Sequence, residues 1–456
     1  MSATATTEKK YLKWYQKLAY GSGDLASNCS YGLVSSFVLL YLTGTLGLDS
    51  AIIGSLMLAS KVLDGISDVI FGTLIDRTHS KLGKARPWML FGQVGVSLCL
   101  FLLFAIPAGS TTMQYIYFFI VYTALNAVFY TANGIAYSSL VALITKNNNE
   151  RVQLGSFRFM FAVVTNIFMG FAVTGMVEKF GSGAAGWRTT ALIFAIVGLV
   201  VNTISCLAVK ELPEEELSGN TSEAAEEGKA VAEEKKHGFA ETAKILVHNK
   251  YYLMILAIYI VYYIMSNLTT GAGVFCATYY WGDGSLLGQF SMMKMFPVII
   301  ALAIAPVLIK KTGSMQKVNF WGYAISSVLG IPMIYFAMQK NLSMFLLFMF
   351  IKGVFAGTLS GSLNALIAEA SGYTTRTTGV HMDGMMYSCS SLGVKVGGGI
   401  GTAAVGWLLK LGGFVGTATV QSESAIRMIF NLYITFPFVI GIIITVLLAF
   451  LDVEKA

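Results

Sequence analysis

Three charged residues share one face of a segment that otherwise has the composition of a membrane-spanning helix. In the stretch KVLDGISDVIFG, Lys61, Asp64 and Asp68 are spaced by three and four residues, and in a helix such spacings place side chains in one stripe. If Asp76 marks the end of this helix, Asp64 and Asp68 lie roughly 18 and 12 Å inward, near the middle of a bilayer. A charged Asp or Lys at that depth costs about 2.5 to 3.5 kcal/mol. The excess of carboxylates predicts a hydrated cation site, in which Asp64 and Asp68 bind Na⁺ as metal ligands or share a proton. A structural ion pair with Lys61 is the alternative.

Composition identifies a lipid bilayer as the solvent of this chain. Of its 456 residues, 55% are hydrophobic and 12% are charged, and the mean hydropathy is +0.67, values that a water-soluble globule does not have. A bilayer core about 30 Å thick requires roughly 20 apolar residues per helix. The sequence contains about a dozen such runs, without the alternation of a β-barrel. We therefore expect an all-α membrane protein with twelve transmembrane helices. The runs lie near residues 20–43, 51–75, 88–107, 114–144, 156–177, 188–208, 252–277, 287–309, 318–338, 343–369, 384–410 and 426–451.

Basic residues are concentrated in alternate loops. Lys9, Lys10, Lys13 and Lys17 precede the first run, and the connection DRTHSKLGKARP after the second run is also basic, whereas the loops GTLGLDS and IPAGSTTMQ contain no Lys or Arg. By the positive-inside rule, both termini and the central loop are cytoplasmic. We expect an integral multi-pass protein of the plasma membrane, which in a bacterium is the inner membrane. The net charge of +7 then reports topology, and we expect no binding to nucleic acid.

One change of composition divides the chain. Residues 210–238 are acidic, rich in Ala, Ser and Gly, and poor in aromatic residues, so this segment cannot bury enough apolar surface to fold alone. We expect an N-terminal six-helix bundle over residues 1–209, a cytoplasmic linker over 210–250 and a C-terminal six-helix bundle over 251–456. Two six-helix halves with similar loops suggest an internal repeat, the architecture that moves a solute by rocking one half against the other.

Further charged residues fall inside the apolar runs. Arg158 and Lys395 come from opposite halves, as a central solute site requires, although snorkelling or packing against helix ends is the alternative for both. Asp24 begins the first run. For Lys294 and Lys352 we assign no partner and no role.

Several motifs together resemble one family. VLDGISDVIFGTLIDRTHSKLGKARPW, TGVHMDGMMYSCSSLGVK, ERVQLGSFR and YGSGDLASN resemble, in order along nearly the whole chain, the segments of the glycoside-pentoside-hexuronide:cation symporters, a branch of the major facilitator superfamily. The resemblance implies a major facilitator fold. It also implies a secondary active transporter that couples uptake of a glycoside, oligosaccharide or hexuronide to a cation by alternating access.

The resemblance assigns roles to individual residues. It implies cation binding by Asp64, Asp68 and Thr131. Substrate-binding roles follow for Asp24, Asn28, Asn133, Tyr137, Arg158, Tyr387 and Lys395. Lys61, one turn before the cation site, is a gating or structural charge. The loop after this helix is predicted to be a cytoplasmic latch, and its gating or structural charges are Asp76, Arg77, Lys84 and Arg86.

Two departures from the melibiose permease pattern affect the solute. Asn28 aligns with a sugar-binding aspartate, and Gly134 aligns with a second one, with Asn133 one position earlier. A pocket that lacks these acids but keeps Arg158 and Lys395 would suit a carboxylate-bearing glycoside such as a glucuronide. The same losses remove an oxygen ligand for a cation, so the coupling ion is either Na⁺ or H⁺. Tyr137 and Tyr387 have motif positions that suit sugar stacking, although most such aromatic residues serve packing.

Other classes of function are separable from this one. The four His residues form no HExxH motif or pair at helical spacing, so we expect no enzyme and no cofactor beyond the coupling ion. A lysolipid or other amphiphile symporter of the same superfamily and a sugar-sensing membrane receptor are the alternatives. The expected partners are a small sugar, a monovalent cation and membrane lipid, and we expect the chain to work as a monomer.

Overall fold

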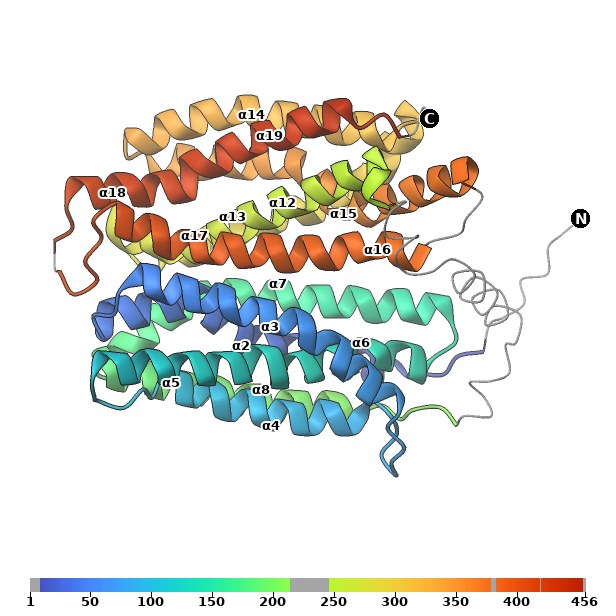
Figure 1. Ribbon diagram of the computed structural model, residues 1–456, viewed down its shortest axis with the longest axis horizontal. Helices are drawn as coiled ribbons and strands as arrows, with labels where there is room; N and C mark the ends of the chain where they lie inside the picture. Colours follow the sequence, from blue (N-terminus) through green and yellow to red (C-terminus); the bar gives the residue numbers. More distant parts are fainter. Residues whose placement is uncertain (1–8, 214–245, 379–382, 419, 454–456) are drawn as a thin grey trace, which may run out of the picture. The chain divides into compact units, whose positions relative to one another are not determined.

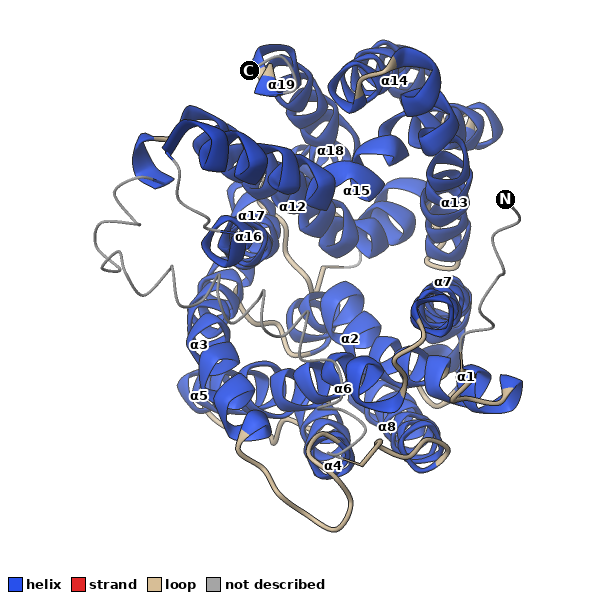
Figure 2. Cartoon of the chain, turned by 90° about the vertical axis from the view of Figure 1, so that its right-hand side faces the viewer, coloured by secondary structure: helices blue, strands red, loops and turns tan. Residues whose placement is uncertain are grey.

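The chain is built from helices throughout its described part. The computed structural model describes residues 9–213, 246–378, 383–418 and 420–453, and all elements in these ranges are helices or loops (Figure 2). They form twelve long helical segments, and eleven of these are long and apolar enough to cross a membrane. The twelfth is the helix that carries Lys61, Asp64 and Asp68. The prediction of a twelve-helix, all-α membrane protein is confirmed.

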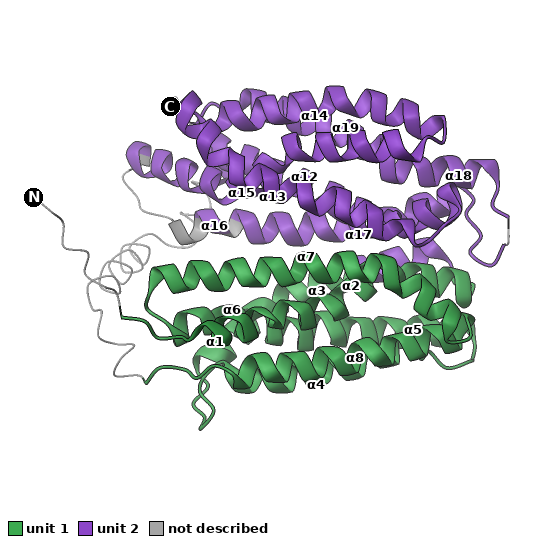
Figure 3. Ribbon diagram, turned by 180° about the vertical axis from the view of Figure 1, so that it is seen from behind, with its two compact units in different colours: residues 1–48, 59–219 green, residues 49–58, 220–456 purple. Residues whose placement is uncertain are grey.

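The contacts divide the chain into two compact units, which are described separately (Figure 3). Unit 1 comprises residues 1–48 and 59–219, and unit 2 comprises residues 49–58 and 220–456. The predicted boundaries at 209 and 251 stay a prediction, and residues 214–245 of the predicted linker lie outside the described residues.

Six helical segments belong to the N-terminal half (Figure 1), and two of them contain a π-helical turn, labelled η. In chain order the elements are α1 Trp14–Gly21, α2 Gly23–Leu40, η1 Tyr41–Thr45, α3 Ser50–Asp76, α4 Arg86–Leu103, α5 Thr111–Thr123, η2 Ala124–Tyr130, α6 Thr131–Ile144, α7 Asn148–Lys179 and α8 Gly183–Leu207.

The C-terminal half contains the other six segments. They are α12 Lys250–Phe275 with η3 Cys276–Trp281, α13 Leu286–Thr312, α14 Met315–Met338, α15 Leu342–Thr378, α16 Asp383–Leu392 with η4 Gly393–Gly397 and α17 Gly398–Leu411, and α18 Glu423–Phe430 with η5 Asn431–Thr435 and α19 Phe436–Phe450.

Two glycines set the position of α2 in unit 1. A Cβ added at Gly21 would lie 2.5 Å from Cβ of Phe157, and one added at Gly23 would lie 2.8 Å from the Tyr137 ring. Only glycine permits this approach without moving a neighbour. The end of α1 therefore lies directly against α7, and the first turn of α2 lies directly against α6. These two helices carry Arg158 and Tyr137.

The start of α4 is fixed by one carboxylate. Glu211 accepts hydrogen bonds from the backbone N–H groups of Lys84, Ala85 and Arg86 at 2.7 to 3.1 Å. These are orphan donors at a helix N-terminus, where the helix dipole also favours a negative charge. Glu211 thereby ties the segment that follows α8 to the loop between α3 and α4.

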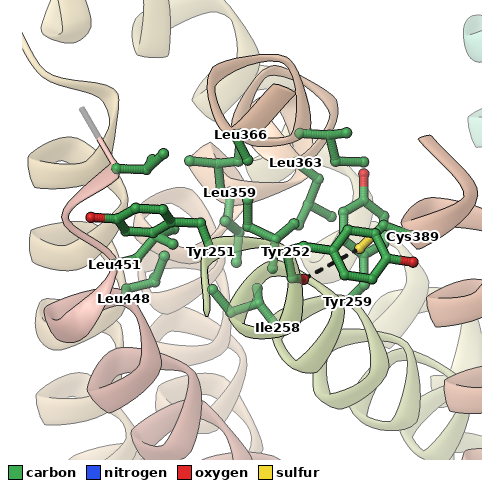
Figure 4. Packing of buried hydrophobic residues seen from close by; sticks show 14 of the residues in the cluster. Tyr251, Tyr252, Ile258, Tyr259, Leu359, Leu363, Leu366, Cys389, Leu448 and Leu451 are labelled. Atoms are coloured by element: carbon green, nitrogen blue, oxygen red, sulfur yellow. Dashed lines mark hydrogen bonds between the residues drawn. The ribbon is translucent and has the colours of Figure 1, made fainter. Parts of the chain in front are cut away.

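The core of unit 2 is apolar and aromatic. Side chains from α12, α15, α16 and α19 form one cluster (Figure 4). Within it Tyr251 and Tyr259 of α12 are 1% and 2% exposed. The phenol of Tyr259 donates a hydrogen bond to Asn364 Oδ1 at 2.8 Å, so the buried hydroxyl is satisfied while its ring packs.

The first turns of α3 pack within unit 2 against α17. Ser50 Oγ donates to the carbonyl of Gly406 at 2.9 Å, and a Cβ at Gly54 would lie 2.7 Å from the Ala403 carbonyl. Asp49 caps α3 and pairs with Lys410 at 2.6 Å. Although burial opposes ionisation, these hydrogen bonds hold the pKa of Asp49 below its usual value. Residues 49–58 belong to unit 2 because of this close contact.

Candidate functional site

Asp64 lies at the centre of a polar group in unit 1. Its side chain is buried, and Thr131 Oγ1 of α6 donates a hydrogen bond to Asp64 Oδ1 at 2.6 Å. Lys61 Nζ lies 3.5 Å from the other oxygen, Oδ2. That distance exceeds the roughly 2.7 to 2.9 Å of a close ammonium–carboxylate hydrogen bond. The contacts of this carboxylate thus include one short bond to a neutral hydroxyl and a longer contact with a cation.

The exposed face of α3 lies on the other side of the helix from Asp64. Val62, Ile66 and Val69 are 62%, 58% and 73% exposed, whereas Asp64 is 6% exposed. Positions two residues before and after a helical residue point away from it, so Asp64 points into unit 1. Asp68, one turn further on, is only partly buried.

A π-helical turn precedes the hydroxyl that contacts Asp64. η2 ends at Tyr130, immediately before Thr131. The Thr131 hydroxyl lies 2.9 Å from the carbonyl of Asn126 as well as 2.6 Å from Asp64. A hydroxyl has one proton to donate, so it can bond Asp64 or Asn126 fully, but not both. Such turns often occur at functional sites. The widened turn thus gives Thr131 two alternative acceptors.

A second charged group lies at the start of α2. Arg158 Nε of α7 donates to Asp24 Oδ2 at 2.6 Å, with side chains 25% and 17% exposed. The guanidinium also lies over the Tyr137 ring, with Cζ 4.2 Å from the centroid. Tyr137 in turn donates from its hydroxyl to the Tyr20 carbonyl at 2.7 Å, while the Tyr20 hydroxyl donates to the Tyr137 carbonyl. The result is a platform in which a partly exposed cation and carboxylate lie beside the ring of Tyr137, which is buried at 2% exposed.

Amide side chains extend this group along α2. Asn28 follows Asp24 by one turn and donates to its carbonyl at 2.7 Å. Asn166 of α7 donates to Asn28 Oδ1 at 2.9 Å. One further turn along α2, Tyr31 stacks on Tyr130 with ring centroids 5.5 Å apart. Spacings of four and three residues place Asp24, Asn28 and Tyr31 on one face of α2.

Tyr31 connects the two charged groups. Lys61 Nζ lies 5.9 Å from the centroid of the Tyr31 ring, within the range of a cation–π contact. Its stacking partner, Tyr130, precedes Thr131 on the same helical segment. The face of α2 that begins at Asp24 therefore ends beside the residues that surround Asp64.

Some predicted site residues lie elsewhere. Asn133 is 3% exposed and donates to Gln93 Oε1 of α4 at 2.6 Å, so the structure does not join it to Asp24 and Arg158, and its role in substrate binding stays a prediction. Lys395 and Tyr387 belong to unit 2. Lys395 lies in the π-helical turn η4, and Tyr387 is 41% exposed on α16.

The predicted latch residues have two different environments. Asp76 and Arg77 are exposed at the end of α3. Lys84 and Arg86 instead flank the start of α4, where Arg86 Nε donates to the Cys206 carbonyl at 3.2 Å. Lys84 and Arg86 also offer their backbone N–H groups to Glu211.

Sequence reasoning missed three neighbours of these groups, namely Tyr20, Asn166 and Glu211. Asn166 follows Arg158 by eight residues, a spacing that keeps both near one face of α7, and this was a usable signal. Tyr20 and Glu211 meet partners more than a hundred residues away in the sequence, and a single sequence contains no local sign of such contacts.

Comparison with known proteins agrees with this architecture. The sequence profile of the family described as MFS/sugar transport protein matches residues 19–455. The chain is 26% identical over 451 residues to the isoprimeverose transporter of Lactiplantibacillus pentosus, covering 98% of this chain and 90% of that protein. It is 24% identical over 427 residues to a putative glycoside/cation symporter of Escherichia coli (strain K12), covering 93% and 88%. The crystal structure of a D-xylose-proton symporter superposes with a TM-score of 0.67 at 12% identity, covering 98% of this chain and all of that one (100%), which establishes likeness of fold alone.

Proposed function

The chain belongs to the MFS/sugar transport protein family, in its glycoside-pentoside-hexuronide:cation symporter branch, and we propose that it is a secondary active transporter that moves a glycoside or related sugar together with a cation by alternating access. The family and the fold are those of transporters and not of enzymes. The observation that carries the proposal is the buried Asp64, held by the Thr131 hydroxyl and only loosely by Lys61. A carboxylate at this depth in a bilayer is costly unless a cation or a hydrogen-bond partner compensates it.

In the proposed mechanism, the positive charge of Lys61 takes the place of the coupling cation beside Asp64 until that cation binds. When no ion is bound, its ammonium partly compensates the charge of Asp64 at 3.5 Å. An arriving Na⁺ or proton neutralises Asp64 directly, and Lys61 then moves toward the Tyr31 ring that already lies 5.9 Å away. Oxygen ligands for Na⁺ would come from Asp64, Asp68 and Thr131. For H⁺, a protonated Asp64 would release the Thr131 hydroxyl to bond the Asn126 carbonyl.

The proposed sugar site is the platform formed by Asp24, Arg158 and Tyr137. A guanidinium paired with a carboxylate can exchange that partner for sugar hydroxyls or for a substrate carboxylate. Gly134 is the position that aligns with the second aspartate of the melibiose permease pattern, and a Cβ placed there would meet no atom of another described part of the chain within 4 Å. That open space and the retained Arg158 support a carboxylate-bearing glycoside as the solute. Lys395 and Tyr387 are proposed to contribute from unit 2.

The remaining assignments follow from sequence and family. We propose that the protein is a monomer in a bacterial inner membrane with both termini in the cytoplasm. Asp76 and Arg77, which are exposed, are proposed to form a cytoplasmic latch with the loop that follows them. Charge reversal of both residues is then expected to change the populations of the transport states in accessibility labelling.

Uptake by proteoliposomes tests the proposal. Purified protein would be reconstituted and supplied with a panel of labelled neutral glycosides and glucuronides under an imposed Na⁺ gradient, an imposed H⁺ gradient or neither. We expect concentrative uptake of at least one glycoside that requires one of the two gradients. Asp64→Asn should abolish this dependence, and the exposed Glu178→Gln should not. Ion-independent equilibration in the wild-type protein, or gradient-driven uptake by Asp64→Asn, would contradict cation coupling at Asp64.

A further inference from the structure

Two lysines inside unit 2 take no part in the proposed transport mechanism. Lys294 of α13 donates to the hydroxyls of Thr269 and Thr270 at 3.3 and 3.1 Å. Lys352 of α15 has no hydrogen bond or ion pair with any described residue. Neither ammonium therefore has a carboxylate partner in the part of the chain that the structure describes. An ammonium without a counter-charge is unfavourable inside a bilayer.

Close helix packing brings the two lysine positions to the same level of unit 2. A Cβ added at Gly353 would lie 2.9 Å from Cβ of Pro297 and 3.6 Å from the Met293 carbonyl. Lys352 and Lys294 are the immediate chain neighbours of Gly353 and Met293. The backbone positions of the two lysines are therefore close to each other at the contact between α13 and α15.

Both lysines line one cavity of about 180 Å³. The cavity lies among α12, α13, α14, α15 and the η5–α19 segment. An engineered cavity of about 150 Å³ holds a benzene molecule, so the space admits a sulfate ion, or a carboxylate with the carbon atoms that carry it. The remaining wall is apolar or hydroxylic, and none of the described lining residues is Asp or Glu.

The wall also offers neutral donors. Tyr323, Ser326 and Tyr433 line the cavity, and the hydroxyl groups of these three residues have no hydrogen-bond partner among the described residues. The nearest described acid further along α15, Glu369, is exposed and roughly 25 Å from Lys352 along the helix. The described wall of the cavity therefore offers two ammonium groups and three free hydroxyl donors but no carboxylate, so the charge of the site is positive.

We propose that this cavity is an anion-binding site, in which Lys294 and Lys352 hold an oxyanion or halide and the free hydroxyls donate to it. The anion is either a free inorganic ion or the acidic group of a solute. Every described residue that lines this cavity belongs to unit 2. An inorganic anion would bind here even if the transported sugar were neutral.

Direct binding to the purified full-length protein in detergent tests the site. The probes are ³⁵S-sulfate, ³⁶Cl-chloride and ¹⁴C-glucuronate in a scintillation proximity assay, each with excess unlabelled competitor. We expect saturable binding of at least one probe. Lys294→Met and Lys352→Met should each weaken it at least tenfold, because each removes one charge-assisted contact. Lys310→Met is the matched control, since Lys310 is an exposed lysine near the end of the same helix as Lys294, and its binding should equal that of the wild type.

The outcomes identify the source of the anion and decide whether the proposal holds. Sulfate or chloride binding that glucuronate does not displace indicates a free inorganic anion, and glucuronate binding in the absence of those ions indicates the acid of a solute. No saturable binding of any probe to the wild-type protein overturns the proposal without need of a variant. Unchanged binding in both lysine variants overturns it as well. Glycoside uptake under an ion gradient is scored separately, so a failure of this site is distinct from a failure of symport.

Discussion

Replacement of Asp64 separates a transport role from a structural ion pair. At an effective dielectric constant of about 20, unit charges separated by the 3.5 Å between Lys61 Nζ and Asp64 Oδ2 attract by about 5 kcal/mol before desolvation is subtracted. Removal of one partner from a buried pair typically costs about 3 to 5 kcal/mol, since the remaining charge is left uncompensated. Asn at position 64 still accepts the Thr131 hydrogen bond. We therefore place the loss of stability for Asp64→Asn near 3 kcal/mol, caused mainly by Lys61.

A double-mutant cycle isolates that cause. Lys61→Met removes the stranded ammonium, so the double variant Lys61→Met, Asp64→Asn should recover at least about 2 kcal/mol relative to Asp64→Asn alone. Thermal unfolding in detergent measures this recovery, and proteoliposome uptake measures transport. If Asp64 binds the coupling cation, the stable double variant still shows no ion-dependent uptake. If the double variant is stable and transports the sugar against its gradient, Asp64 and Lys61 are only scaffolding and the proposed mechanism is refuted.

Three further substitutions test neighbouring parts of the structure. Arg158→Lys keeps the charge but loses the Nε hydrogen bond and the stacking on tyrosine, so we expect sugar affinity to fall about tenfold, roughly 1.4 kcal/mol, in equilibrium binding. Glu211→Gln weakens the cap at the start of α4 and should lower stability by about 1 kcal/mol in thermal unfolding, whereas the exposed Glu178→Gln should leave it unchanged. Gly406→Ala places a methyl group against the first turn of α3 and should destabilise, while Gly175→Ala, which meets no atom within 4 Å, should be neutral or stabilising by about 0.5 to 1 kcal/mol. Equal effects within either matched pair would contradict the packing described.

The number and class of the elements were predictable because a bilayer leaves few choices. Each apolar run long enough to cross it must satisfy its own backbone, and a helix does so. The ends of the elements were less accessible. The run predicted at 343–369 is a helix over Leu342–Thr378, because a helix can continue beyond its apolar part, where hydropathy no longer marks it. The π-helical turns before Thr131 and around Lys395 have no signature in composition either.

The candidate site was partly visible in spacing and partly not. Lys61, Asp64 and Asp68 could be placed on one stripe from the sequence because a single helix carries them. Asn133 shows the limit of such reasoning. A shift by one residue turns a helical side chain by about 100°, and Asn133 accordingly donates to Gln93 of α4, whereas the neighbouring position, Gly134, faces open space. Nearness in the sequence therefore did not preserve the direction of the side chain.

Coupling between the two groups of unit 1 requires contacts that differ between the cation-bound and cation-free states. Tyr31 is positioned to supply them, because its ring stacks on Tyr130, beside Thr131, and faces Lys61 at 5.9 Å. The same helix, α2, carries Asp24 two turns earlier. If Lys61 moves onto this ring when the cation binds, the ring and α2 respond together, and the cation raises the affinity for the sugar.

Substitution of Tyr31 by Leu tests this route. The change keeps an apolar side chain but removes an aromatic pair and a cation–π contact, each worth about 0.5 to 1.5 kcal/mol. We expect the ratio of sugar dissociation constants without and with saturating cation to fall about fivefold. By reciprocity, the factor by which the sugar raises the affinity for the cation must fall by the same amount. Tyr41→Leu is the control, since Tyr41 packs on Phe104 and Trp187 at the other end of this helical segment. It should lower stability while the ratio stays constant. A Tyr31→Leu protein that binds sugar more weakly by the same factor at every cation concentration would mean that the ring only shapes the sugar site, and coupling would then have to pass through a different contact of Asp64.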